Sequence, residues 1–108
     1  MISKLTLKFL TDLHKNNTRD WYHANKDRYK DAIGNFEDLV AILLHTITGF
    51  DESVMGVEPK DCLFRIYRDI RFAKDKTPYK TWFGAALKQG GRKQAGSGYY
   101  IHISPRQV

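Results

Sequence analysis

Apolar and polar residues alternate differently in the two halves of the chain, which separates a helical first half from an extended second half. The clearest signal lies between about Lys26 and Thr48, where apolar residues recur at intervals of four, three, four, three and four positions. This spacing places them on one helical face and predicts a helix over the range. The positions are Tyr29, Ile33, Phe36, Val40, Leu43 and Ile47.

A shorter helix is predicted near the N-terminus, ending at about Lys15. Ser3 or Thr6 can cap its first turn, because a short hydroxyl side chain accepts hydrogen bonds from free backbone N–H groups. The polar run at positions 16–18 then favours a turn. Thr18 or a neighbouring asparagine is expected to begin the next helical turn.

After Pro59 the pattern changes to period two, which predicts a first strand over 62–67. Residues 82–87 and 99–104 are interpreted as a second and a third strand, joined by a glycine-rich connection. Helices followed by strands predict an α+β fold, with the N-terminal helices packed on a small antiparallel sheet of about three strands. A length of 108 residues suits a single domain.

Composition excludes several classes of protein. The longest strongly apolar stretch, residues 39–44, is too short to cross a membrane, and the N-terminus has no secretory signal pattern. A cytoplasmic location is therefore expected. Cys62 is the only cysteine, which excludes an internal disulfide. A lone cysteine is usually buried, so Cys62 is expected to act as a small hydrophobic residue of the core.

The net charge of +6 is unevenly distributed. Residues 1–64 have eight Lys or Arg against ten Asp or Glu, whereas residues 65–108 have ten against two. A half this basic attracts phosphates, nucleic acid or acidic proteins. A soluble basic surface without a dedicated partner is the alternative.

The basic residues are densest between positions 64 and 84, where aromatic residues alternate with them. An arginine side chain can donate two parallel hydrogen bonds to one phosphate or carboxylate group, and lysine adds a mobile positive charge. This mixture can therefore hold an anion from several sides. The aromatic residues can equally belong to the core. The candidate ligand-binding residues are Arg65, Arg68, Arg71, Lys74, Asp75, Lys76, Tyr79 and Lys80.

Arg68 shares a face with Ile66 and Ile70 if the first strand continues, which is unusual for a charged residue. Either the strand bends there, or Arg68 pairs with a carboxylate such as Asp69 or Asp75. No phosphate-binding loop, metal-ligand pattern or catalytic triad can be built from the spacing, so no cofactor or metal is expected. Arg92 and Lys93 follow a glycine pair that can expose backbone N–H groups to an anion, although a flexible hairpin loop explains the glycines as well.

The run FRIYRDIRFAKDKTPYKTWFG at 64–84, together with Asn16, Asn17 and Trp21 and the stretch from Gly98 to Ile103, resembles the microbial family known as domain of unknown function 2461. The resemblance implies no established activity. It implies matches to the central motif of that family, with departures at Ala73 and Trp82. It also implies a longer family domain of which this chain is the N-terminal part, so that the last strand has an exposed edge at which two copies can associate. The matching positions are Arg65, Tyr67, Arg68, Asp69, Arg71, Phe72, Lys74, Asp75, Lys76, Thr77, Pro78, Tyr79, Lys80 and Gly84.

Three functions are compatible with these observations. The leading hypothesis is a binding module that holds an anionic, phosphate-containing small molecule or nucleic acid against segment 65–80. The first alternative is an enzyme acting on a phosphate-containing or sugar-like substrate, with Asp69 or Asp75 as acid or base and with Arg68, Arg71 and Lys76 stabilising anionic charge. The second is a structural or interaction domain without a ligand.

Overall fold

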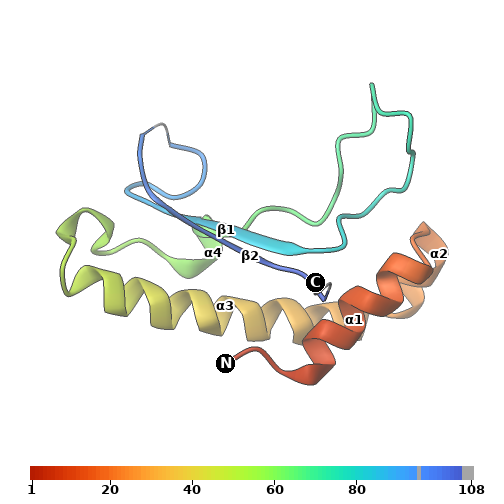
Figure 1. Ribbon diagram of the computed structural model, residues 1–108, viewed down its shortest axis with the longest axis horizontal. Helices are drawn as coiled ribbons and strands as arrows, with labels where there is room; N and C mark the ends of the chain where they lie inside the picture. The colour runs from red at the N-terminus through yellow and green to blue at the C-terminus, as the bar shows by residue number, and fades with distance from the viewer. Residues whose placement is uncertain (95, 106–108) are drawn as a thin grey trace.

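The computed structural model describes residues 1–94 and 96–105 and places a long helix across one side of a small sheet (Figure 1). Helices come first in the chain and strands last, so the fold class is α+β, as predicted. The elements are α1 (Lys4–Lys15), α2 (Arg19–Ala24), α3 (Lys26–Thr48), the 3-10 helix η1 (Glu52–Val54), α4 (Pro59–Cys62), β1 (Phe83–Leu87) and β2 (Tyr99–Ile103).

The first helices begin at the expected caps. Ser3 Oγ accepts a hydrogen bond from the Thr6 N–H at 3.2 Å, and Thr18 Oγ1 accepts one from the Trp21 N–H at 3.2 Å. Helix α3 spans the predicted range from Lys26 to Thr48. These boundaries agree with the prediction. They could be predicted because capping side chains and helical periodicity act over only a few residues.

The buried side of α3 is slightly rotated from the predicted face. Phe36, Val40 and Ile47 are buried as expected, and Ala32 and Leu44 are buried as well. The other three predicted positions are partly buried and pack against the core from its margins, at Tyr29, Ile33 and Leu43.

Strands β1 and β2 form an antiparallel pair, with Phe83 opposite Ile103 and Leu87 opposite Tyr99. Because side chains alternate between the faces of a strand, Phe83, Ala85 and Leu87 share one face. That face meets the core, where the rings of Phe83 and Phe36 are 5.6 Å apart. Gly84 and Ala86 therefore face away from α3, on what we call the outer face of the sheet.

The sheet has two strands among the described residues, not about three as predicted. Pro59 begins a short helix that includes Cys62, so the predicted first strand cannot start there. Residues 63–68 do run antiparallel to 78–85, but only through the isolated bridges Leu63–Ala85 and Tyr67–Tyr79. The pairing is interrupted because one residue on the first segment lies opposite three residues, 81–83, on the second.

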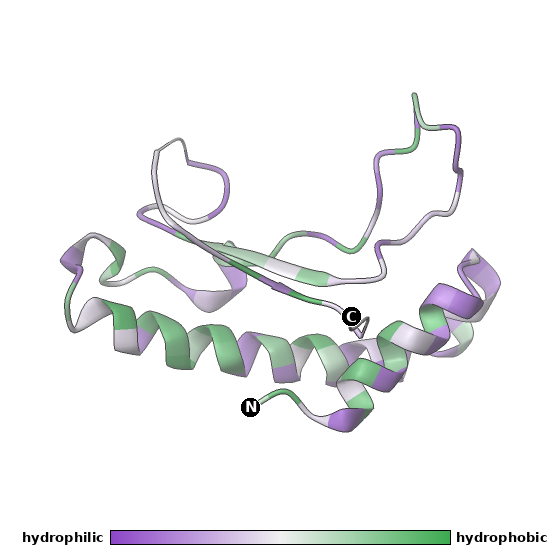
Figure 2. Ribbon diagram, viewed as in Figure 1, coloured by the Kyte–Doolittle hydropathy of each residue, from purple (hydrophilic) through white to green (hydrophobic). Residues whose placement is uncertain are grey.

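The core lies between α1, α3 and the inner face of the sheet. The Phe9 ring is fully buried at its centre, 5.9 Å from the ring of Trp21 and 6.4 Å from that of Phe83. Cys62 is also buried, which confirms its predicted role. Figure 2 shows hydrophobic residues along much of α3 and β1 and hydrophilic residues along much of the two loops on the outer side. The free edge of β2 pairs with no other described strand, and self-association there stays a prediction.

Candidate functional site

The interrupted pairing beside β1 fixes the backbone of the basic segment. The Phe64 N–H donates to the Gly84 carbonyl at 2.9 Å, and the Lys80 N–H donates to the Ile66 carbonyl at 2.8 Å. Only Arg65 lies between the two hydrogen-bonded positions on the first segment, so residues 81–83 form a bulge on the second. A bulge changes the direction in which neighbouring side chains point, and here it brings Lys80 and Trp82 together over the Phe64 ring.

Arg68 holds the loop that connects these two segments. Its Nη1 donates to Thr77 at both the carbonyl oxygen and Oγ1, each at 2.8 Å, and to the Asp75 carbonyl at 3.2 Å. The ion pair with Asp75 is longer, at 3.7 Å. Arg68 therefore pairs with Asp75, one of the two carboxylates considered from the sequence, but its closest partners are oxygen atoms of Thr77.

Tyr79 is part of the core beneath this loop. Its side chain is 1% exposed and its ring stacks on that of Tyr22 at 4.3 Å. Asn17 fixes the backbone at this position, because its side-chain amide donates to the Tyr79 carbonyl at 2.8 Å and accepts from the Tyr79 N–H at 3.0 Å. Burial raises the pKa of the Tyr79 hydroxyl. The side chain of Tyr79 lies outside the larger hollow described next.

A hollow with a volume of about 740 Å³ lies beside the basic segment. Two loops contribute to it, the one before β1 and the one between β1 and β2, and both rise on the side of the sheet away from α3 (Figure 1). We call this hollow the cationic cleft, since its lining includes six basic side chains and a single carboxylate, that of Asp69. The lining residues are Phe64, Arg65, Tyr67, Arg68, Asp69, Ile70, Arg71, Lys80, Arg92 and Lys93.

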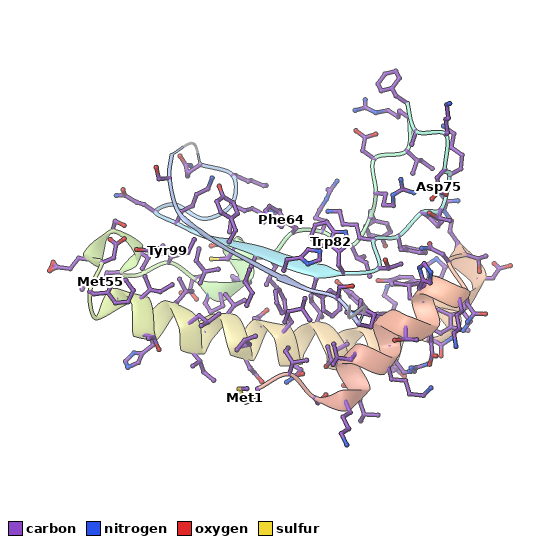
Figure 3. All side chains as sticks on the ribbon, in the orientation of Figure 1. Met1, Met55, Phe64, Asp75, Trp82 and Tyr99 are labelled. Atoms are coloured by element: carbon purple, nitrogen blue, oxygen red, sulfur yellow. The ribbon has the colours of Figure 1, made fainter. Side chains whose placement is uncertain are left out.

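Two aromatic rings hold the ammonium group of Lys80. The Nζ atom lies 5.1 Å from the centre of the Trp82 ring and 5.8 Å from that of Phe64, distances at which the negative face of a ring attracts a cation. Figure 3 shows Phe64 and Trp82 next to β1. Burial lowers the pKa of Lys80, and the charges of Arg65 and Arg92 lower it further.

The absence of a side chain at Gly84 makes this arrangement possible. A Cβ atom at that position would overlap the Trp82 ring and lie 3.0 Å from Cδ2 of Phe64. The two rings therefore lie directly over the strand, in an edge-to-face pair with centres 6.4 Å apart. This packing fixes both rings that contact Lys80.

The two carboxylates considered as acid or base are held ionised. Arg71 donates to both oxygens of Asp69, at 3.1 and 2.9 Å, and these bonds lower the pKa of Asp69. Hydrogen bonds from the backbone and side chain of Thr77 lower the pKa of Asp75 in the same sense. Both shifts favour the ionised form of the carboxylate.

Four of the eight candidate residues line the cationic cleft, namely Arg65, Arg68, Arg71 and Lys80. The other four lie outside it. Lys76 Nζ donates to the Ile70 carbonyl at 2.6 Å and thereby closes the loop, and Lys74 is exposed. Asp75 and Tyr79 line a smaller hollow on the other side of Arg68 and Lys80.

The predicted site did not include Phe64, set Trp82 aside, and considered Arg92 and Lys93 only as neighbours of a glycine pair that can bind an anion. The glycine pair before Arg92 was the available signal, because Gly90 and Gly91 both adopt positive φ angles in the turn that leads to it. Among the described residues no three His, Cys, Asp or Glu side chains gather as metal ligands would.

The structure is that of a small α+β protein in which six basic residues line one hollow on the outer side of the sheet. A family model described as conserved hypothetical protein (DUF2461) matches residues 5–108, and the chain belongs to this family. No curated protein and no solved structure matches the chain. In the described part of the chain, no helix is long and apolar enough to cross a membrane.

Proposed function

We propose that the protein binds a phosphate-containing anionic ligand in the cationic cleft. The observation that supports this function is that six basic residues from two loops line one hollow, whereas a single acidic residue lines it with them. Like charges repel, so a fold gathers them at this density at a cost in stability unless an anion neutralises them. The volume of the cleft, about 740 Å³, falls in the usual range for small-molecule sites, about 300–1,000 Å³.

The basic residues of the cleft fall into two groups. Arg68 is engaged with the loop oxygens and holds the loop in place, and Arg71 is paired with Asp69. No described carboxylate forms an ion pair with Arg65, Lys80, Arg92 or Lys93. These four side chains supply the charge for a ligand, and the forked guanidinium groups of the two arginines match the oxygens of a phosphate.

Binding is favoured over acid–base catalysis because both carboxylates of this region are already engaged, Asp69 by the guanidinium group of Arg71 and Asp75 by the backbone N–H of Thr77. Binding of a small ligand is favoured over nucleic acid because the charges lie in a hollow and not along an extended surface. The experiment below therefore includes an oligonucleotide, which distinguishes nucleic-acid binding from the binding of a small phosphate compound. Nucleic-acid binding through phosphates would weaken steeply and linearly with the logarithm of salt concentration.

Calorimetric titration with inorganic phosphate, pyrophosphate and a single-stranded oligonucleotide tests the proposal. Arg65→Gln and Arg92→Gln should each weaken pyrophosphate binding roughly tenfold, the effect of losing about 1.4 kcal/mol of charge-assisted hydrogen bonding. Lys74→Gln removes the same charge from an exposed position outside the cleft and is the matched control. The proposal fails if no phosphate compound binds at low salt, or if Lys74→Gln weakens binding as much as the cleft variants.

A further inference from the structure

Four aromatic side chains gather on the outer face of the sheet. His102 lies opposite Gly84 in the register of β1 and β2, and Tyr100 is two positions earlier in the same strand. Since side chains alternate between the faces of a strand, both lie on the outer face. The rings of Phe64 and Trp82 lie over Gly84 on this face (Figure 3). We call the side chains of Phe64, Trp82, Tyr100 and His102 the ring platform.

The ring platform is open to solvent along β2. Tyr100 is 65% exposed, although Nζ of Lys88 lies 5.8 Å from the centre of its ring. His102 is also exposed, and its ring lies 4.7 Å from that of Trp82 at an angle of 34°. The solvated face of an antiparallel sheet usually has polar side chains. Exposed rings at this place therefore indicate a partner that has a flat surface of its own.

The ring platform adjoins the cationic cleft. Phe64 lines the cleft, and the centre of its ring is 6.4 Å from that of Trp82. Lys80 also lines the cleft, and its ammonium group lies 5.1 Å from the centre of the Trp82 ring. Arg65, which has no ion pair with a described carboxylate, follows Phe64 directly in the chain. Positive charge and aromatic surface are thus close enough for one small ligand to contact both.

We propose that the ligand of the cationic cleft is a nucleotide whose base stacks on the ring platform. The inference rests on the proposed function, because Arg65 and Arg92 would bind the phosphate and the rings would bind the base. Every base has a flat aromatic face, so stacking on a protein ring needs no hydrogen bonds to the edge of the base. Stacking of bases on aromatic side chains of a β-sheet is a known mode of nucleotide recognition in RNA-binding domains.

Calorimetric titration with AMP and with ribose 5-phosphate at low salt tests the inference, because these compounds have the same sugar and phosphate and only AMP has a base. AMP should bind about tenfold more tightly, the effect expected from stacking of one base. The double variant His102→Ala with Tyr100→Ala should abolish this difference and leave the affinity for ribose 5-phosphate unchanged. A second double variant, His102→Phe with Tyr100→Phe, keeps both rings and should retain the difference.

Phe72→Ala is the matched control for the loss of a ring. Phe72 is 94% exposed and lies outside both the cationic cleft and the ring platform, so its removal should leave both affinities unchanged. Equal affinities of the wild-type protein for AMP and ribose 5-phosphate would overturn the inference and leave the phosphate site intact. Absence of binding by pyrophosphate, AMP and ribose 5-phosphate alike would overturn both proposals.

Two other occupants of the ring platform are distinguished by further measurements. A single-stranded oligonucleotide that binds more tightly than AMP, and whose affinity falls steeply with salt concentration, would assign the rings to a nucleic-acid strand. A dimer that is detected by light scattering, and that Tyr100→Ala dissociates but AMP does not, would assign them to a second copy of the chain. Either result would overturn the inference.

Discussion

Gly84→Ala is the substitution whose effect follows most directly from the geometry of the site. Gly84 is buried in β1, and an added Cβ would overlap the Trp82 ring and lie 3.0 Å from Cδ2 of Phe64. Neither ring can move inward, because the strand itself lies beneath them. The rings must therefore shift away from the strand or the strand must bend.

The expected loss of stability can be set against a matched control. Forcing one extra carbon into a packed site costs about 1–3 kcal/mol, and replacing glycine by alanine recovers about 0.4–1 kcal/mol through the unfolded chain. The difference between the midpoints of these two ranges gives a net loss of about 1.3 kcal/mol for Gly84→Ala. Gly34 lies in the middle of α3 with no atom within 4 Å of an added Cβ, so Gly34→Ala should stabilise the protein by about 0.5–1 kcal/mol.

Urea denaturation followed by circular dichroism measures both effects, provided that the slope of unfolding free energy against urea concentration is unchanged. The same chemical substitution should move the midpoint in opposite directions at the two positions. A Gly84→Ala variant as stable as the wild type, together with a stabilised Gly34→Ala variant, would refute the close packing of Trp82 and Phe64 over β1.

Two further predictions concern ion pairs. Arg68→Ala should destabilise the protein by about 1.5–3 kcal/mol because it leaves loop oxygens without their charged donor, whereas Arg71→Ala, which breaks an exposed pair, should leave the urea midpoint almost unchanged. The hydrogen bond from Arg28 lowers the pKa of Asp12 in the folded protein. The stabilisation from this pair is therefore fully present above the pKa of Asp12 in the unfolded chain, about 3.9, and is lost as the pH falls through the lower pKa of the folded state. Asp12→Asn should then be less stable than the wild type at pH 6, and the difference should shrink as the pH falls below about 3.9. A difference that stays constant as the pH falls would contradict the pairing.

The parts of the fold that the sequence predicts correctly are those that depend on near neighbours. The bounds of α1 and α3 follow from a capping serine and from helical periodicity. Strands β1 and β2 follow from an apolar run and from regular alternation. In each case the residues that determine the structure lie within a few positions of one another.

The first predicted strand, 62–67, is not part of the sheet for a non-local reason. Alternation from Cys62 onward is real, and Ile66 is buried as the pattern requires. Whether such a segment becomes a strand depends on its partner, however, and the bulge at 81–83 interrupts the pairing after a few hydrogen bonds. Pro59 also favours the first turn of a helix, a local signal that the change to period two concealed.

The cationic cleft was only half predictable for the same reason. Charge density along the chain identified Arg65 and Lys80, but Arg92 comes from a different loop and reaches the cleft through the turn between β1 and β2. Lys74 and Lys76 lie in an irregular loop, where no periodicity indicates the direction of a side chain.

The contacts of the basic residues explain why the cleft can remain positive in a stable fold. Arg68 and Arg71 are compensated by loop oxygens and by Asp69, so the walls hold their shape without a ligand. The remaining charges repel one another across the hollow, and the cage of Phe64 and Trp82 offsets part of that repulsion at Lys80. An anion in the cleft would relieve the rest. Different side chains therefore stabilise the fold and attract the ligand. A change at Arg68 should affect folding, whereas a change at Arg65 should affect binding.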